Sequence, residues 1–116
     1  MNLATPILIG DSSEEFRSLL RDMLTKHGFF HIVEATNQNE VMNFLDQEKK
    51  DFFILIQSEI LNENVLQKME QKNFLILAQA NKPQTISLAA RLGVKYFLSF
   101  PFSSQGLVEK IRLIAQ

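Results

Sequence analysis

The sequence predicts an α/β protein in which helices cover both faces of a five-stranded parallel sheet. Short apolar runs alternate along the chain with segments whose apolar residues recur at helical spacing. The apolar runs are continuous rather than alternating in polarity, which is typical of strands buried on both faces. A length of 116 residues and a hydrophobic content of 46% suit one domain with a substantial core. We therefore expect a single domain over residues 1–116.

The first strand–helix unit begins with an apolar strand over residues 6–10. Ser12, with Glu15 three residues later, predicts a capping box at the start of the following helix. The apolar residues of this helix fall on one stripe, which we expect to be buried: Phe16, Leu19, Leu20, Met23 and Leu24. Gly28 predicts the end of the helix.

The middle of the chain continues the alternation. A strand of mixed polarity within residues 29–35 indicates a place near a sheet edge, and a helix is expected over residues 37–48. A fully apolar strand over residues 52–56, a short helix within 62–71 and another apolar strand over 74–78 follow.

The last two units begin with a helix that starts at Pro83 and ends at Gly93. Residues 94–99 are predicted to form the fifth strand, and Ser103 or Ser104 caps the fifth helix. The apolar residues of that helix are expected to face inward: Leu107, Val108, Ile111 and Ile114.

Five strands alternating with five helices predict the doubly wound order of a flavodoxin-like (βα)5 three-layer sandwich. Sheets of this kind place their working site in the crevice at the carboxyl ends of the strands. The segments that end the strands, and that we expect to line this crevice, are residues 10–13, 57–60, 78–80 and 99–102.

Composition and charge exclude several classes of protein. The net charge is -1 and the signs are interspersed, so direct nucleic-acid binding has no electrostatic support. The absence of Cys excludes a disulfide framework and a thiolate metal site. The two histidines, His27 and His31, flank a turn without acidic or Cys partners at metal-ligand spacing, and we expect them to face solvent. No segment reads as a signal peptide or a membrane span, so we expect a cytoplasmic protein without a membrane partner.

Four pieces of sequence occur in an informative order and spacing. They are residues 7–11 ahead of a helix that carries Phe16-Arg17, then residues 33–35, residues 89–94 and residues 100–102. With these pieces, the chain from about residue 6 to residue 115 resembles the receiver domain of bacterial two-component response regulators, of the chemotaxis-regulator type. The resemblance implies a signal-transduction domain of a phosphorelay.

The resemblance also assigns positions to a phosphorylation site. Of the two adjacent acids that hold magnesium in the family, Asp11 matches the first and Ser12 replaces the second. The phosphate-accepting aspartate falls on Gln57, the hydroxyl residue that contacts the phosphate on Ala78, and the lysine after the fifth strand on Phe100. Of the five active-site positions, only Asp11 keeps its expected type.

Other positions carried over from the family concern switching and shape. The aromatic switch position falls on Phe97, and the resemblance suggests a cis bond between Phe100 and Pro101. Leu61 replaces the proline that normally follows the acceptor by four residues, and the segment to Phe74 is shorter than usual, so we expect a truncated third helix.

These replacements remove the chemistry of phosphoryl transfer, which depends on positioning and charge neutralisation. A carboxamide is uncharged, a poor nucleophile and a weak magnesium ligand, and a phenylalanine brings no positive charge. Asp11 is then only a residual metal candidate. We therefore expect a degenerate pseudo-receiver with no catalytic residues, metal or cofactor, which is not an enzyme and acts by protein–protein contact.

The expected contact surface follows from the family's usual output and dimer face, formed by the fourth helix, fifth strand and fifth helix. In this chain it comprises roughly residues 84–91, 95–99 and 105–112. A protein partner or a second copy of the chain is the expected occupant.

Plainer and alternative interpretations stay open. Asp11 can serve only to bias the start of the first helix, Gln57 can be a hydrogen-bonding plug, and Phe97, Phe100 and Phe102 can be core residues rather than a contact surface. A functional phosphorelay receiver with a non-standard phosphosite is one alternative. The block Gly10-Asp11-Ser12 also resembles the nucleophile of GDSL serine hydrolases, although no His follows His31 to serve as its base. A flavin or nucleotide binder would need a glycine-rich phosphate loop that the first turn lacks.

Overall fold

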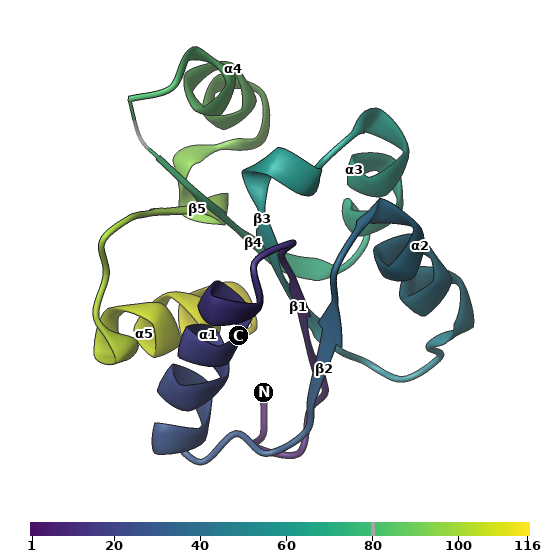
Figure 1. The fold of residues 1–116 in the computed structure, drawn as a ribbon, viewed down its shortest axis with the longest axis vertical. Helices are drawn as coiled ribbons and strands as arrows, with labels where there is room; N and C mark the ends of the chain where they lie inside the picture. Colours follow the sequence, from purple (N-terminus) through teal and green to yellow (C-terminus); the bar gives the residue numbers. More distant parts are fainter. Residues whose placement is uncertain (80) are drawn as a thin grey trace.

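The strands form one parallel sheet in the order β2-β1-β3-β4-β5 (Figure 1). The computed structural model describes residues 1–79 and 81–116. Its strands are β1 (Ile7–Gly10), β2 (Ile32–Ala35), β3 (Phe53–Gln57), β4 (Asn73–Ala78) and β5 (Phe97–Ser99). The chain moves from β1 outward to the edge strand β2, then returns across β1 to β3 and continues to β5 at the other edge. This doubly wound, flavodoxin-like order confirms the predicted fold class.

Helices cover both faces of the sheet, as predicted (Figure 1). They are α1 (Glu14–Lys26), α2 (Gln38–Gln47), α3 (Glu63–Met69), α4 (Pro83–Leu92) and α5 (Ser104–Ile114). The helices α1 and α5 pack on one face, while α2 and α3 pack on the other, where α4 contributes Leu92. The third helix is short, and a 3-10 turn (Ser58–Ile60) stands between it and β3.

The core has two halves because the central strands are apolar on both faces. Ile7 and Ile9 of β1 face α1 and α5, and Leu8 faces α2 and α3. All three side chains are fully buried. Burial of such side chains contributes about 1.5–3 kcal/mol each to folding, which explains why continuous apolar runs define this sheet.

The start of α1 differs from the prediction by one residue. The N-cap is Ser13, whose hydroxyl accepts the backbone N–H of Phe16 at 3.2 Å. The predicted capping box at Ser12 is therefore wrong. The reason is Asp11, whose carboxylate accepts the N–H of Ser13 at 2.8 Å and so holds the chain in a turn before the helix begins.

Three further expectations need correction. Leu19 lies outside the buried stripe and is 45% exposed, since α1 contacts the sheet mainly through Leu20 and Leu24. Residues 94–96 form a 3-10 turn rather than strand, because β5 pairs with β4 only from Phe97 onward. His27 is half-buried rather than solvent-facing, and its Nε2 lies 3.3 Å from the hydroxyl of Ser104.

Two remaining points complete the description. Residue 80, the last of the segment expected at the carboxyl end of β4, lies outside the described residues. Within the described part of the chain, every helix falls short of the length and apolar character needed to cross a membrane.

Candidate functional site

The carboxyl ends of β1 and β3 open into a hollow of about 280 Å³. Its lining comprises Asp11, Ser12, Ser13, Phe16, Gln57, Glu59 and Phe100. Four of the five positions that the sequence assigned to a phosphorylation pocket therefore come together at this hollow. The fifth, Ala78, ends β4, is 1% exposed and is not among the residues that line the hollow.

Asp11 is the one buried carboxylate of this hollow, with a residue exposure of 5%. One of its oxygens, Oδ1, accepts the N–H of Ser13, while its backbone carbonyl accepts Nη1 of Arg17 at 2.8 Å. Burial raises the pKa of Asp11 above its ordinary value, and the carboxylate of Glu59 raises it further. The hydrogen bond from Ser13 and the charge of Arg17 oppose this rise only in part.

Gln57 ends β3, and its side chain hydrogen-bonds to the backbone of the segment that follows directly. Its Oε1 accepts the backbone N–H of Glu59 and so caps the 3-10 turn that follows. The carboxamide thus satisfies a backbone donor, as expected for a hydrogen-bonding plug. It offers neither negative charge nor a nucleophilic oxygen to the hollow.

Phe100 brings an aromatic ring to the wall of the hollow. Its ring meets Phe16 edge-on at a centroid distance of 4.8 Å and stacks on Phe102 at 5.2 Å. The backbone N–H of Phe100 donates to the carbonyl of Ala78 at 3.2 Å, which holds the backbone of Phe100 against the end of β4. The peptide bond between Phe100 and Pro101 is cis.

The arginines near the hollow, and Glu59 at its edge, form ion pairs. Arg17 and Arg21 of α1 both pair with Glu34 on the edge strand, at 3.0 and 2.7 Å. Those two guanidinium groups, Arg21 foremost, hold the pKa of Glu34 below its ordinary value. Glu59 is exposed at the mouth, where Nζ of Lys82 lies 3.6 Å from its Oε1. The site is therefore acidic with aromatic walls.

A serine hydrolase that used Ser12 as its nucleophile would need a histidine base beside it. In the described part of the chain Ser12 has no hydrogen bond to a histidine, and His27 lies against Ser104 of α5. Ser58, which follows Gln57 and would be a candidate for modification by a serine kinase, is 7% exposed, which leaves little of it accessible. Among the described residues no group of three His, Cys, Asp or Glu side chains is arranged to hold a metal ion.

Phe97 lies beside a separate, apolar hollow of about 420 Å³ between α4 and β5. Its ring is half-buried and packs against the core half that α2 and α3 cover. Around the same hollow, Ile86 is 59% exposed and Val94 is 76% exposed. Exposed large apolar residues gathered at one place are typical of contact surfaces.

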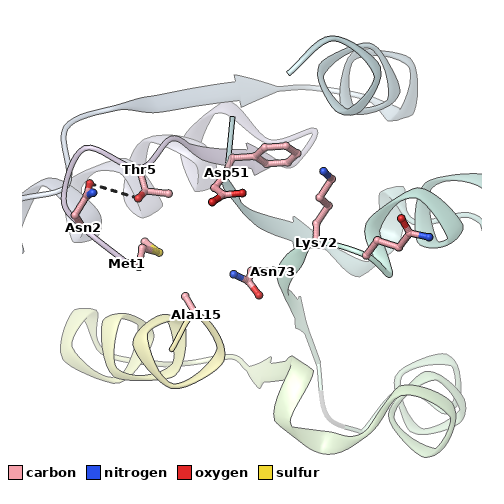
Figure 2. Close-up of a pocket in the computed structure, with 9 residues that line it drawn as sticks. Met1, Asn2, Thr5, Asp51, Lys72, Asn73 and Ala115 are labelled. Carbon is pink, nitrogen blue, oxygen red and sulfur yellow. Dashed lines mark hydrogen bonds between the residues drawn. The ribbon is translucent and has the colours of Figure 1, made fainter. Parts of the chain in front are cut away.

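Another hollow, of about 630 Å³, lies at the opposite end of the sheet (Figure 2). Figure 2 shows Asp51, Lys72 and Asn73 around it, together with Met1 and Ala115 near the chain ends. The side chain of Lys72 turns to the ring of Phe52, with Nζ 5.4 Å from the centroid. The hollow lies at the amino ends of the strands, away from the edge where doubly wound sheets bind ligands.

No family model matches the sequence. The structure is similar to the signal receiver domain of an HD domain-containing protein from Pseudomonas fluorescens Pf-5, with a TM-score of 0.78, 19% identity and coverage of 97% of this chain and 94% of that one. It is also similar to the chemotaxis response regulator CheY4 of Vibrio cholerae, with a TM-score of 0.76, 14% identity and coverage of 96% and 98%. A third similar structure is a response regulator from Burkholderia pseudomallei that holds a phosphorylated aspartic acid, a calcium ion and citrate; the TM-score is 0.71, the identity 19% and the coverage 92% and 66%. At these identities the likeness shows that the chain has the receiver fold.

Sequence reasoning missed the groups that give the site its present character. Neither the contact of Phe16 with Phe100 nor the ion pair of Lys82 with Glu59 joins residues close in sequence. The available signal was the position of Phe16 on the first turn of α1 and of Glu59 two residues after Gln57, because the segments after β1 and β3 meet at one edge of the sheet in this topology.

Proposed function

We propose that this chain is a non-enzymatic signalling domain of the receiver fold that is not phosphorylated on an aspartate and acts by protein–protein contact. The observation that carries the proposal is the content of the carboxyl-end hollow. Gln57 stands at the acceptor position with its carboxamide oxygen capping a turn, and the ring of Phe100 stands where the family carries its lysine. A phosphoryl group at this place would meet two carboxylates and no free cation among the described residues.

The apolar hollow between α4 and β5 supports the second half of the proposal. Its exposed residue Ile86 lies on the face by which the resembled family contacts its partners and its own second copy, and the exposed Val94 directly precedes the fifth-strand part of that face. A protein partner or a homodimer is therefore the expected ligand of this chain, rather than a nucleic acid or a membrane.

The test is intact-mass spectrometry after incubation with acetyl phosphate and magnesium. The chain is expected to remain unmodified, because the site lacks an acceptor carboxylate, a metal cage and a lysine. A matched variant restores the missing groups through Ser12→Asp, Gln57→Asp, Ala78→Thr and Phe100→Lys, and it is expected to gain a phosphate at position 57.

The outcome that overturns the proposal is a stoichiometric phosphate on the unmodified chain. If tandem mass spectrometry placed it on Asp11 or Ser58, the chain would instead be a phosphorelay receiver with a non-standard phosphosite.

A further inference from the structure

We propose that the hollow at the carboxyl ends of β1 and β3 binds an organic cation, namely the ammonium or guanidinium group that ends a lysine or arginine side chain or a small amine. The inference rests on the proposed function, since it requires a hollow that magnesium and phosphate do not occupy. A buried carboxylate, two aromatic rings and a second, displaceable carboxylate line the same space.

The buried carboxylate supplies the charge. Asp11 is 5% exposed and lines the hollow, yet only its Oδ1 has a hydrogen-bond partner among the described residues. The nearest guanidinium, that of Arg17, donates to the backbone carbonyl of Asp11 and to Glu34 instead. The other oxygen, Oδ2, keeps some contact with solvent, because every fully buried side-chain nitrogen or oxygen of the described residues has a hydrogen-bond partner. A carboxylate that is mostly desolvated and forms no ion pair stabilises a cation that approaches its open oxygen.

The aromatic rings select the kind of cation. Phe16 and Phe100 both line the hollow, and their ring centroids are 4.8 Å apart. The face of an aromatic ring attracts an ammonium or guanidinium group, whereas magnesium prefers an octahedral shell of oxygen ligands that the rings cannot supply. Anions are disfavoured by both carboxylates. The lining therefore fits an organic cation better than either component of the family's phosphorylation chemistry.

Glu59 and Lys82 define the entrance. Their ion pair spans 3.6 Å, and the side chains are 63% and 50% exposed. Exposed pairs of this kind contribute little to stability, so an incoming cation can replace Lys82 at Glu59. The volume of about 280 Å³ leaves room for the end of one such side chain.

The test is a titration of the full chain followed by amide chemical shifts in two-dimensional NMR. Butylammonium and methylguanidinium are the probes, butanol is the neutral control of equal shape, and magnesium is the competing ion. We expect saturable shifts at Ser12, Ser13, Glu59 and Phe100 with the two organic cations, and none with butanol.

Variants assign the effect to named groups. Asp11→Asn keeps the Oδ1 acceptor for Ser13 and is expected to weaken butylammonium binding about tenfold or more. Asp22→Asn, an exposed acid on the same helix, is expected to leave binding unchanged. Lys82→Gln removes the competing ammonium and is expected to strengthen binding. Phe100→Lys supplies an internal ammonium and is expected to abolish it, while Phe30→Lys adds the same charge at a residue that is 70% exposed and has no effect.

The source of the cation is resolved by comparing a capped lysine tripeptide with putrescine. Tighter binding of the peptide assigns the group to a partner protein, and tighter binding of putrescine assigns it to a free amine; both support the cation site. Absent shifts, equal shifts in the Asp11→Asn variant, or magnesium binding tighter than butylammonium would overturn the inference. These failures leave the proposed function standing as long as acetyl phosphate produces no adduct.

Discussion

At the scale of single residues, the carboxyl-end hollow keeps one acid and replaces the groups that would make that acid useful for phosphate chemistry. Asp11 is buried, the amide oxygen of Gln57 accepts the N–H of Glu59, and Phe100 packs against Phe16. A buried carboxylate whose pKa is raised by burial destabilises the folded chain at neutral pH. Groups that cost stability and persist at a strand end are characteristic of binding sites.

This cost predicts the effect of Asp11→Asn on stability. Because the folded-state pKa of Asp11 is raised, the folded state binds its proton more tightly than the unfolded state does. The stability from this group is present below the ordinary value of 3.8 and is lost as the pH rises through the folded-state pKa. The variant is therefore expected to have a higher free energy of unfolding than the wild type at neutral pH, and the difference should shrink below pH 3.8.

Urea unfolding at the two pH values measures this difference. Asp22→Asn, at an exposed site on the same helix, serves as the control and should change stability little at either pH. A variant less stable than the wild type at neutral pH would mean that Arg17 stabilises the Asp11 carboxylate more than burial disfavours it.

At the scale of elements, the helices differ in how firmly they are held. Two arginines join α1 to the edge strand β2 through Glu34, and Arg17 also reaches the backbone at the hollow. By contrast, Thr85 is the one buried residue of α4. A bidentate but exposed pair between Arg91 and Glu63 links α4 to α3, and it lowers the pKa of Glu63. The helix beside Phe97 thus has an apolar flank that its own sheet does not cover.

We expect Ile86→Asp to weaken contact with a partner or a second copy without lowering stability, because Ile86 is already 59% exposed and lines the hollow between α4 and β5. Sedimentation velocity over a range of concentrations measures self-association, and affinity capture from the native organism measures partner binding. Phe30→Asp is the matched control, since Phe30 is 70% exposed but lies outside the α4–β5 hollow. Equal behaviour of the two variants in both assays would exclude this face as the contact surface.

At the scale of the whole molecule, the sheet separates two apolar layers that depend on different helices. Leu107 of α5 is buried in one layer and Met69 of α3 in the other, both at 0% exposure. Because a sheet of buried strands lies between them, the two side chains share no cavity into which the surroundings could relax together.

Shortening a buried side chain in either layer is expected to lower the stability of the chain strongly. Leu107→Ala and Met69→Ala should each lower the free energy of unfolding by about 2–5 kcal/mol, a large part of the 5–15 kcal/mol typical of such proteins. Leu113→Ala on α5, at 58% exposure, should cost much less and controls for helix propensity. Urea denaturation gives these values, and the double variant should show costs that add to within about 0.5 kcal/mol. Strong coupling between the two would show that the layers are not independent.

Most of the fold could be predicted from the sequence because its signals are local. Fully apolar runs such as residues 52–56 identify central strands, and the mixed polarity of β2 placed it correctly near an edge. Boundaries were less accurate where a tertiary contact decides them. The turn held by Asp11 places the N-cap of α1 at Ser13 instead of Ser12. The fifth strand is limited to Phe97–Ser99 because only these residues pair with β4.

For the candidate site, the sequence by itself determined which chemical groups are present: Gln57 in place of an acceptor carboxylate, Phe100 in place of a lysine, and Asp11 alone among the expected acids. Those assignments remain predictions of function. Only the tertiary structure decided that Asp11 is buried, that the ring of Phe16 packs against that of Phe100, and that Lys82 pairs with Glu59. The physical reason is that residue type is local, whereas burial, electrostatic coupling and ring packing depend on distances between segments far apart in the chain.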